Sequence, residues 1–192
     1  MNVMANIAIL ASGSGSNAQR ISEYFTGHPS VRVKLILSNN PGAYVLTRAH
    51  SLGIPSEVFN RDSFYNSDDI LRILKQYDIS FIVLAGFLWL IPSSILEAYP
   101  GRIVNIHPAL LPKYGGKGMY GQKVHEAVIK AGELESGISI HYVNAHYDEG
   151  DIIFQARCPV LPGDNAERLA GRIHELEYEH YPRVIEEVVG GW

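Results

Sequence analysis

The sequence predicts an α/β fold built on a doubly wound, mostly parallel sheet. Short apolar runs alternate with helical patterns along the first half of the chain, as expected when each strand is followed by a helix. The run Phe81–Leu84 is apolar at every position, which is typical of a strand covered on both faces. A glycine- and serine-rich loop at residues 12–17 separates the first apolar run from the first helical pattern. Together these features indicate parallel strands joined by helices.

The expected elements of the first half follow from local patterns. Apolar runs of strand length predict strands at residues 5–10, 31–37 and 56–59. Helical periodicity predicts helices at residues 17–25 and 44–52. A further helix should begin at residues 67–69, where serine and two aspartates precede inward-facing apolar positions. Right-handed connections arrange such units as a Rossmann-like, doubly wound sheet.

The second half has a different organisation. A glycine-rich segment at residues 115–121 precedes a helix expected at residues 124–131. Alternating patterns predict strands at residues 137–143 and 151–160, which pair as an antiparallel C-terminal extension of the sheet. Asp164 should cap a long final helix that runs to about residue 189. No linker or repeat interrupts the chain, so we expect a single domain, residues 1–192, with two lobes.

Composition and charge exclude several classes of protein. The 192 residues include 46% hydrophobic and 19% charged residues, a globular balance. The net charge of −4 provides no basic field for a nucleic acid or an anionic membrane. Cys158 is the only cysteine, which excludes an internal disulfide. Because the sequence shows neither a signal peptide nor a membrane-spanning run, we expect a cytoplasmic protein.

Residues 12–17 offer a site for an anion. Glycines let backbone N–H groups approach the anion, and the N-terminus of the following helix adds a favourable dipole. Gly13, Gly15 and Ala18 satisfy the dinucleotide fingerprint, but no acidic residue ends the second strand to hold a ribose. The serines and Asn17 instead suit a single phosphate monoester. The alternative is a tight structural turn without a ligand.

Asn105 and His107 lie two positions apart, so an emerging strand would present both side chains on one face. An amide beside an imidazole suits acyl transfer, in which the amide stabilises an oxyanion and the imidazole moves a proton. Asp148, in a loop that returns to the same sheet edge, would orient and charge His107. The alternatives are a satisfied strand-end histidine and an ordinary turn acid.

The other histidines show less specific patterns. His125 lies on a helix face and His141 on a strand, so both are interpreted as structural, whereas His146 could line the same cleft. The spacing of the 8 histidines predicts no metal site. In the last helix, His174 and Glu177 are near helical spacing, and the alternative to a functional role is a solvated charged face.

The apolar segment at residues 84–91 has two parts. Leu84 is expected in the core strand, whereas residues 88–91 follow a glycine and should emerge at the sheet edge. An apolar rim at that edge suits a flat heteroaromatic ring. Trp89 could equally contact another subunit.

Taken together, these motifs resemble those of the formyl-tetrahydrofolate-dependent formyltransferase family over essentially the whole chain. The stretch Asn-x-His-Pro-x-Leu-Leu-Pro, from Asn105, is specific to enzymes of this group. The Gly-Ser-Gly-Ser-Asn loop indicates the branch that acts on glycinamide ribonucleotide. The resemblance implies transfer of the formyl group of 10-formyltetrahydrofolate to the amine of 5-phosphoribosylglycinamide in purine biosynthesis, without a metal.

The resemblance also assigns roles to residues, beginning with Asn105, His107 and Asp148 as the catalytic triad. The substrate-binding residues would be Gly13, Ser14, Gly15, Ser16, Asn17, Pro108, His174 and Glu177. The folate-binding residues would be Arg61, Leu84, Leu88, Trp89, Leu90, Ile91, Asn105, Asn144, Ala145, His146 and Tyr147. Residues 1–100 would form a ribonucleotide phosphate-binding lobe and residues 101–192 a catalytic and folate lobe. The expected partners are these two small molecules, with a monomer or homodimer as the assembly.

The chain departs from the family at Leu88-Trp89, where relatives often have Met-Arg. It also departs after Glu177: relatives commonly have a histidine directly after this glutamate, whereas here the next histidine is His180. The alternative functions are a formyltetrahydrofolate deformylase, a methionyl-tRNA formyltransferase and a noncatalytic nucleotide-binding module. The deformylase commonly has an additional N-terminal domain and the tRNA enzyme an additional basic one. The missing acid after the second strand disfavours a dinucleotide-binding module.

Overall fold

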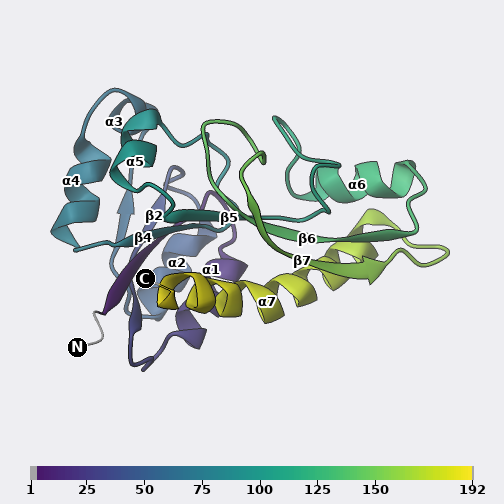
Figure 1. Cartoon of the computed structure of the whole chain (residues 1–192), viewed down its shortest axis with the longest axis horizontal. Helices are drawn as coiled ribbons and strands as arrows, with labels where there is room; N and C mark the ends of the chain where they lie inside the picture. The colour runs from purple at the N-terminus through teal and green to yellow at the C-terminus, as the bar shows by residue number, and fades with distance from the viewer. Residues whose placement is uncertain (1–3, 192) are drawn as a thin grey trace.

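A single mixed sheet organises the chain, as a computed structural model that describes residues 4–191 shows (Figure 1). Its seven strands lie in the order β3-β2-β1-β4-β5-β6-β7. The strands are β1 (Ala5–Leu10), β2 (Val31–Ser38), β3 (Ser56–Val58), β4 (Phe81–Leu84), β5 (Ile103–His107), β6 (Glu135–Tyr142) and β7 (Ile152–Pro159). The first five are parallel, whereas β6 and β7 are antiparallel to their neighbours, which confirms the predicted fold class.

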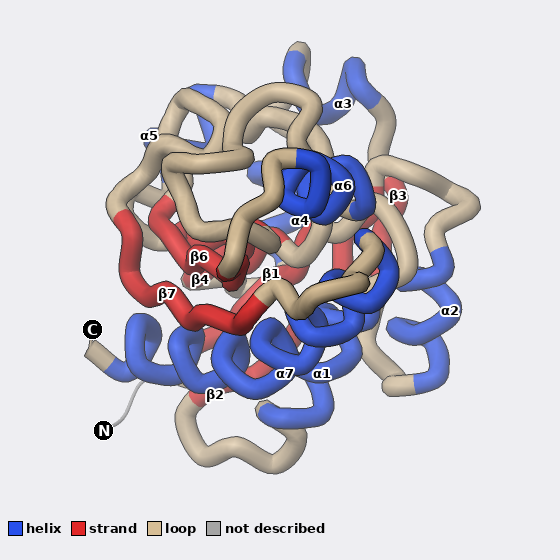
Figure 2. Tube along the Cα trace, turned by 90° about the vertical axis from the view of Figure 1, so that its right-hand side faces the viewer, coloured by secondary structure: helices blue, strands red, loops and turns tan. Residues whose placement is uncertain are grey.

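Helices cover both faces of the sheet. They are α1 (Ser16–Tyr24), α2 (Tyr44–Ser51), α3 (Arg61–Tyr65), α4 (Asp69–Gln76), α5 (Ser93–Ala98), α6 (Gln122–Lys130) and α7 (Ala166–Gly190). Figure 2 shows α1 and α7 on one side of the strands and α3 and α5 on the other. Helix α6 packs against α7 beside the antiparallel strands.

The strands are apolar on both faces because two separate cores form. Alternate residues of β1 illustrate the division, since Ile9 packs with α1, α2 and α7, whereas Leu10 packs with α3, α4 and α5. Both side chains are almost completely buried. Each fully buried aliphatic side chain of this size stabilises the fold by about 1.5–3 kcal/mol. The continuous apolar runs of the sequence therefore reflect strands covered on two sides.

The structure corrects the prediction at three helix positions. Helices α3 and α5 were not predicted, because each is short and lacks a full amphipathic repeat. Asp164 does not cap α7: the cap is Asn165, whose side chain accepts a hydrogen bond from the N–H of Arg168. Asp164 instead accepts a hydrogen bond from the N–H of Leu161 and pairs with Arg172.

The strand order places a ligand site at the carboxyl ends of β1 and β4. The connection from β1 leads to one side of the sheet and the connection from β4 to the other, so the loops diverge and leave a crevice. Helix α7 lies on the same side of the sheet as α1 and reaches this edge. The hydroxyl of its buried Tyr181 donates to the carbonyls of Leu84 and Val104, at 2.8 and 3.3 Å. The long helix is thus bonded to the strand ends that border the crevice.

Candidate active site

A cavity of about 590 Å³ opens at this edge of the sheet. Its wall is formed by the loop at residues 12–17, the segments at residues 84–91 and 105–108, the glycine-rich segment at residues 116–121 and residues 146–148. Most predicted site residues lie in this wall. Arg61, Asn144 and Ala145 do not. Its volume is that of a typical small-molecule site.

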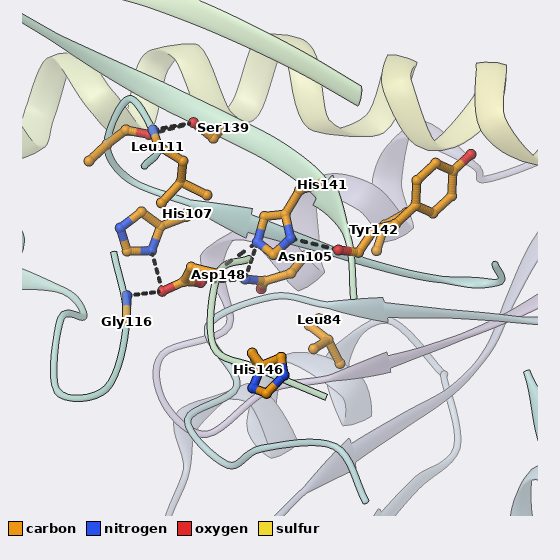
Figure 3. Close-up of polar contacts among 12 residues, drawn as sticks. Leu84, Asn105, His107, Leu111, Gly116, Ser139, His141, Tyr142, His146 and Asp148 are labelled. Atoms are coloured by element: carbon orange, nitrogen blue, oxygen red, sulfur yellow. Dashed lines mark hydrogen bonds and ion pairs between the residues drawn. The ribbon is translucent and has the colours of Figure 1, made fainter. Parts of the chain in front are cut away.

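Strand β5 brings Asn105 and His107 to the same side of the cavity wall. In Figure 3 both side chains converge on Asp148, which comes from the loop between β6 and β7. The Nδ1 atom of His107 lies 3.5 Å from Oδ2 of Asp148, and Nδ2 of Asn105 lies 3.5 Å from its Oδ1. The N–H of Gly116 donates to Oδ2 at 2.9 Å. The loop therefore holds one carboxylate against both predicted catalytic side chains.

The backbone of Asp148 is strained, with φ at 56°. A left-handed conformation costs a non-glycine residue about 1–2 kcal/mol, and such residues cluster at functional sites. The hydrogen bond from Gly116 and the contacts of the carboxylate offset this cost. The strain turns the carboxylate toward β5 rather than toward solvent, and its side chain is only 11% exposed.

His141 is a member of this cluster that the sequence analysis assigned to a structural role. It pairs with Asn105 across β5 and β6, and its side chain is 3% exposed. Its Nδ1 atom lies 2.8 Å from the carbonyl of Tyr142 and donates to it, while Nε2 lies 3.2 Å from Nδ2 of Asn105 and 3.7 Å from Oδ1 of Asp148. The same ring fixes the amide of Asn105. Only the antiparallel pairing of β6 with β5 reveals this, because the two residues are far apart in sequence.

The protonation of His107 differs from the expectation. Burial lowers the pKa of His107, whereas the Asp148 carboxylate and the hydrogen bond with the carbonyl of Tyr114 raise it and offset only part of that shift, so burial opposes the charged ring that the sequence analysis expects. Both ring nitrogens nevertheless face oxygen atoms, since Nε2 lies 2.7 Å from the carbonyl of Tyr114. Burial would raise the pKa of Asp148, but hydrogen bonds and nearby imidazoles outweigh it and lower that pKa. The cluster is therefore a carboxylate with a lowered pKa beside an imidazole whose two nitrogens both face acceptor oxygens.

The loop at residues 12–17 has the geometry of an anion cradle. Gly15 precedes α1 with φ at 75°, and a Cβ atom there would lie 2.3 Å from Cγ2 of Val45, so only glycine fits. Ser16 begins α1, so the free N–H groups of its first turn point toward the cavity end of the loop. The hydroxyl of Ser12 accepts a hydrogen bond from the N–H of Leu88 at 3.0 Å, which joins the cradle to the apolar segment.

Helix α7 contributes a buried acid to the cavity wall next to this loop. Glu177 is 6% exposed, and Oε2 accepts a hydrogen bond from Nδ2 of Asn17 at 2.9 Å. Burial raises the pKa of Glu177 to about 7, and the hydrogen bond from Asn17 only partly opposes the shift. The Oδ1 atom of Asn17 is enclosed and forms no hydrogen bond with any of the residues that the structure describes. His174 also lines the cavity, one turn earlier on α7, where it is exposed, and partial desolvation lowers its pKa.

An apolar rim faces these polar groups. Leu88 is 43% exposed and Ile91 is buried, and both line the cavity together with Trp89 and Leu90. The indole packs against an aromatic cluster that consists of Phe59, Phe64, Tyr65 and Phe87. The guanidinium of Arg61 lies over the rings of Tyr65 and Trp89, 5.1 and 5.7 Å from their centroids. Arg61 thus lies behind the rim, while Asn144 shapes the opposite loop by accepting from the N–H of His146.

Two further findings concern the described part of the chain. Among residues 4–191, no three histidine, cysteine, aspartate or glutamate side chains gather as a metal site. None of the helices in that part is long and apolar enough to cross a membrane.

The fold and this site define a class of protein, and comparison with known proteins identifies it. The formyl transferase family matches residues 5–185, and the chain belongs to this family. It is 38% identical to phosphoribosylglycinamide formyltransferase of Haemophilus influenzae, over 95% of this chain and 86% of that protein. It is 40% identical to the chloroplastic enzyme of Arabidopsis thaliana over 93% of this chain, but the match spans only 63% of that protein.

Solved structures show the same likeness. The chain superposes on glycinamide ribonucleotide transformylase 1 of Geobacillus kaustophilus with a TM-score of 0.87 and 39% identity, over 97% of this chain and all (100%) of that chain. The corresponding structure from Symbiobacterium toebii gives a TM-score of 0.88 with 34% identity, over 98% of this chain and 89% of that one.

Proposed function

We propose that this chain transfers the formyl group of 10-formyltetrahydrofolate to the amine of 5-phosphoribosylglycinamide, giving the N-formyl ribonucleotide of purine biosynthesis. The observation that carries the proposal is the convergence of Asn105, His107 and Asp148 in one cavity that also holds an anion cradle and an apolar rim. The relatives named above carry this activity in their names. No metal takes part in the proposed reaction.

The two ends of the cavity suit the two substrates. The phosphate would be held by Gly13, Ser14, Gly15, Ser16 and Asn17, and the rest of the ribonucleotide by Pro108, His174 and Glu177. The folate ring would lie against Leu84 and residues 88–91, with Asn105, His146 and Tyr147 across from it. Arg61 lies behind Trp89, outside the cavity wall. Asn144 and Ala145 belong to the facing loop. We propose that these three residues contribute to folate binding indirectly. In this proposal residues 1–100 supply the phosphate cradle together with the apolar folate rim, and residues 101–192 supply the catalytic residues, the facing folate loop and the helix with His174 and Glu177.

The catalytic residues would act on the charge that develops as the amine attacks. A bond forms between the amine nitrogen and the formyl carbon, and the formyl oxygen gains negative charge. Asn105 donates a hydrogen bond to this oxygen, an interaction that typically contributes about 10²–10³ in rate. The 3.5 Å contact between its amide and Asp148 is weak and gives way to this stronger acceptor.

His107 and Asp148 would move the proton. The attacking amine releases a proton, and the departing folate nitrogen gains one as its bond to the formyl carbon breaks. His107 is placed to carry this proton, because its two nitrogens face oxygens and negative charge in the cavity favours its protonated form. Holding both substrates in one cavity supplies much of the remaining acceleration.

The test is a reconstitution with each component omitted in turn. Purified protein is mixed with glycinamide ribonucleotide and 10-formyldideazafolate, and absorbance follows the release of the folate. Turnover that needs both substrates is the expected result. Release without the ribonucleotide would establish a deformylase instead, and no reaction would refute the proposed activity. We also propose a cytoplasmic location and a monomer or homodimer as the assembly.

A further inference from the structure

His125 is a buried histidine in the cavity wall that neither the catalytic cluster nor the anion cradle uses. It lies on α6, directly after the glycine-rich segment, and is 3% exposed. Its neighbours Val124 and Val128 on the same helix are buried in the core, whereas His125 borders the cavity. It forms no hydrogen bond with any residue in the described range 4–191, and its Nδ1 atom is enclosed without a partner.

The two ring nitrogens differ in what they can bind. An enclosed N–H without an acceptor is more costly and rarer than an enclosed lone pair, so Nδ1 is the unprotonated nitrogen. The hydrogen then belongs to Nε2. Because Nδ1 is enclosed by protein, Nε2 is the nitrogen available to a molecule in the cavity. His125 therefore offers one neutral N–H donor.

Burial and the neighbouring imidazoles favour the neutral form of the His125 ring. Burial lowers the pKa of His125 to about 4, and the nearby rings of His174 and His107 lower it further. A neutral donor is poorly suited to a phosphate, which favours cations and clustered backbone N–H groups. It suits a neutral oxygen, such as a hydroxyl or an amide carbonyl. His125 lies near His107 and His174, and its helix α6 packs against α7, the helix that carries His174 and Glu177.

We infer that His125 is a substrate-binding residue whose Nε2–H donates to a neutral oxygen, hydroxyl or carbonyl, of the ribosylglycinamide part of the ribonucleotide. The inference rests on the proposed function, because it assumes that the ribonucleotide occupies this end of the cavity. It adds α6 to the elements that hold the substrate. The sequence analysis missed this role, since a single histidine on a helix face carries no spacing signal.

The experiment measures the dissociation constants of glycinamide ribonucleotide and of 10-formyldideazafolate by calorimetry. His125→Ala should weaken ribonucleotide binding about 5- to 10-fold, the usual effect of one neutral hydrogen bond, and leave folate binding unchanged. His125→Gln should recover most of the loss, because the glutamine side chain can place an N–H group near the position of Nε2. Val128→Ala is the matched control, since it truncates a buried residue of the same helix that does not line the cavity.

The variants separate binding from folding. If His125 were only structural, His125→Ala and Val128→Ala would lower the unfolding temperature and neither would change the ribonucleotide constant, which would overturn the inference. Equal weakening of both ligands by His125→Ala would overturn it too. If the unaltered protein failed to bind the ribonucleotide, the proposed function would fall and the inference with it. If the unaltered protein and His125→Ala bound the ribonucleotide equally well, the inference would be refuted and the proposed function would stand.

Discussion

The charge of Glu177 should destabilise the folded protein at high pH, and replacing Glu177 by glutamine should remove that effect. Glutamine keeps the shape of the side chain and an oxygen that accepts from Asn17. What it removes is a carboxylate that is 6% exposed and has one hydrogen-bond donor. A buried carboxylate with so little compensation is costly when ionised.

The magnitude follows from the pKa. The pKa of Glu177 is raised from 4.5 in the unfolded chain to about 7 in the folded one, a shift of about 2.5. Each unit corresponds to 1.36 kcal/mol, so the ionised group costs about 3 kcal/mol. Because the folded pKa is higher than the unfolded one, the protein has its full stability with respect to Glu177 below about pH 4.5. About 3 kcal/mol of the free energy of unfolding is then lost as the pH rises through about 7.

Urea unfolding at pH 5 and pH 8 tests the argument. The free energy of unfolding of Glu177→Gln should exceed that of the unaltered protein by up to about 3 kcal/mol at pH 8 but by less than about 1 kcal/mol at pH 5. Glu179→Gln is the control, since Glu179 is exposed on the same helix and should show no such difference. A Glu177→Gln effect that is equal at both pH values would refute the reasoning. The same variant should bind glycinamide ribonucleotide more weakly, because we assign Glu177 to that substrate.

Three further outcomes are expected. Asp148→Asn should retain the binding of both substrates but lower kcat about 10²-fold or more, because it removes the carboxylate beside His107. Stopped-flow kinetics would test this, and a near-normal kcat would exclude Asp148 from the mechanism. Gly15→Ala should lower the free energy of unfolding in urea by about 2–4 kcal/mol, because of the left-handed backbone and the clash with Val45. Gly13→Ala, which has open space at its Cβ position, should lower it little. Equal losses would contradict the close approach at Gly15. The folded pKa of His125 lies below its unfolded value of 6.5, so protonation of this ring should destabilise the fold by about 3 kcal/mol as the pH falls from 6.5 to 4. The free energy of unfolding of His125→Gln, measured relative to the unaltered protein, should therefore rise by about that amount over this range, and a constant difference would show that the ring is not enclosed.

The main architecture could be predicted because local patterns and global packing agree. The apolar runs that form β1, β2 and β4 are covered on both faces, and their continuous hydrophobicity records that burial directly. The pairing of Asn105 with His107 was readable for a similar reason, since alternation along one strand decides which side chains share a face. These signals need no information from distant parts of the chain.

The remaining site residues could not be predicted because long-range pairing decides their roles. His141 meets Asn105 only through the register of β6 on β5, and nothing near His141 in the sequence encodes that register. His125 faces the cavity because α6 packs on α7, which depends on the tertiary fold. The lowered pKa of His107 depends on how deeply the ring is buried, and burial is a property of the finished structure.

The hydrogen bond between Asn17 and Glu177 has a consequence for how the protein acquires activity. It joins residues 160 positions apart, at the start of the first helix and in the middle of the last. During synthesis, the cradle at residues 12–17 leaves the ribosome long before the helix that completes the cavity. Contacts between such distant segments form slowly, because the intervening chain must first be ordered. Recovery of ribonucleotide binding after dilution from urea should therefore lag behind the recovery of helical signal.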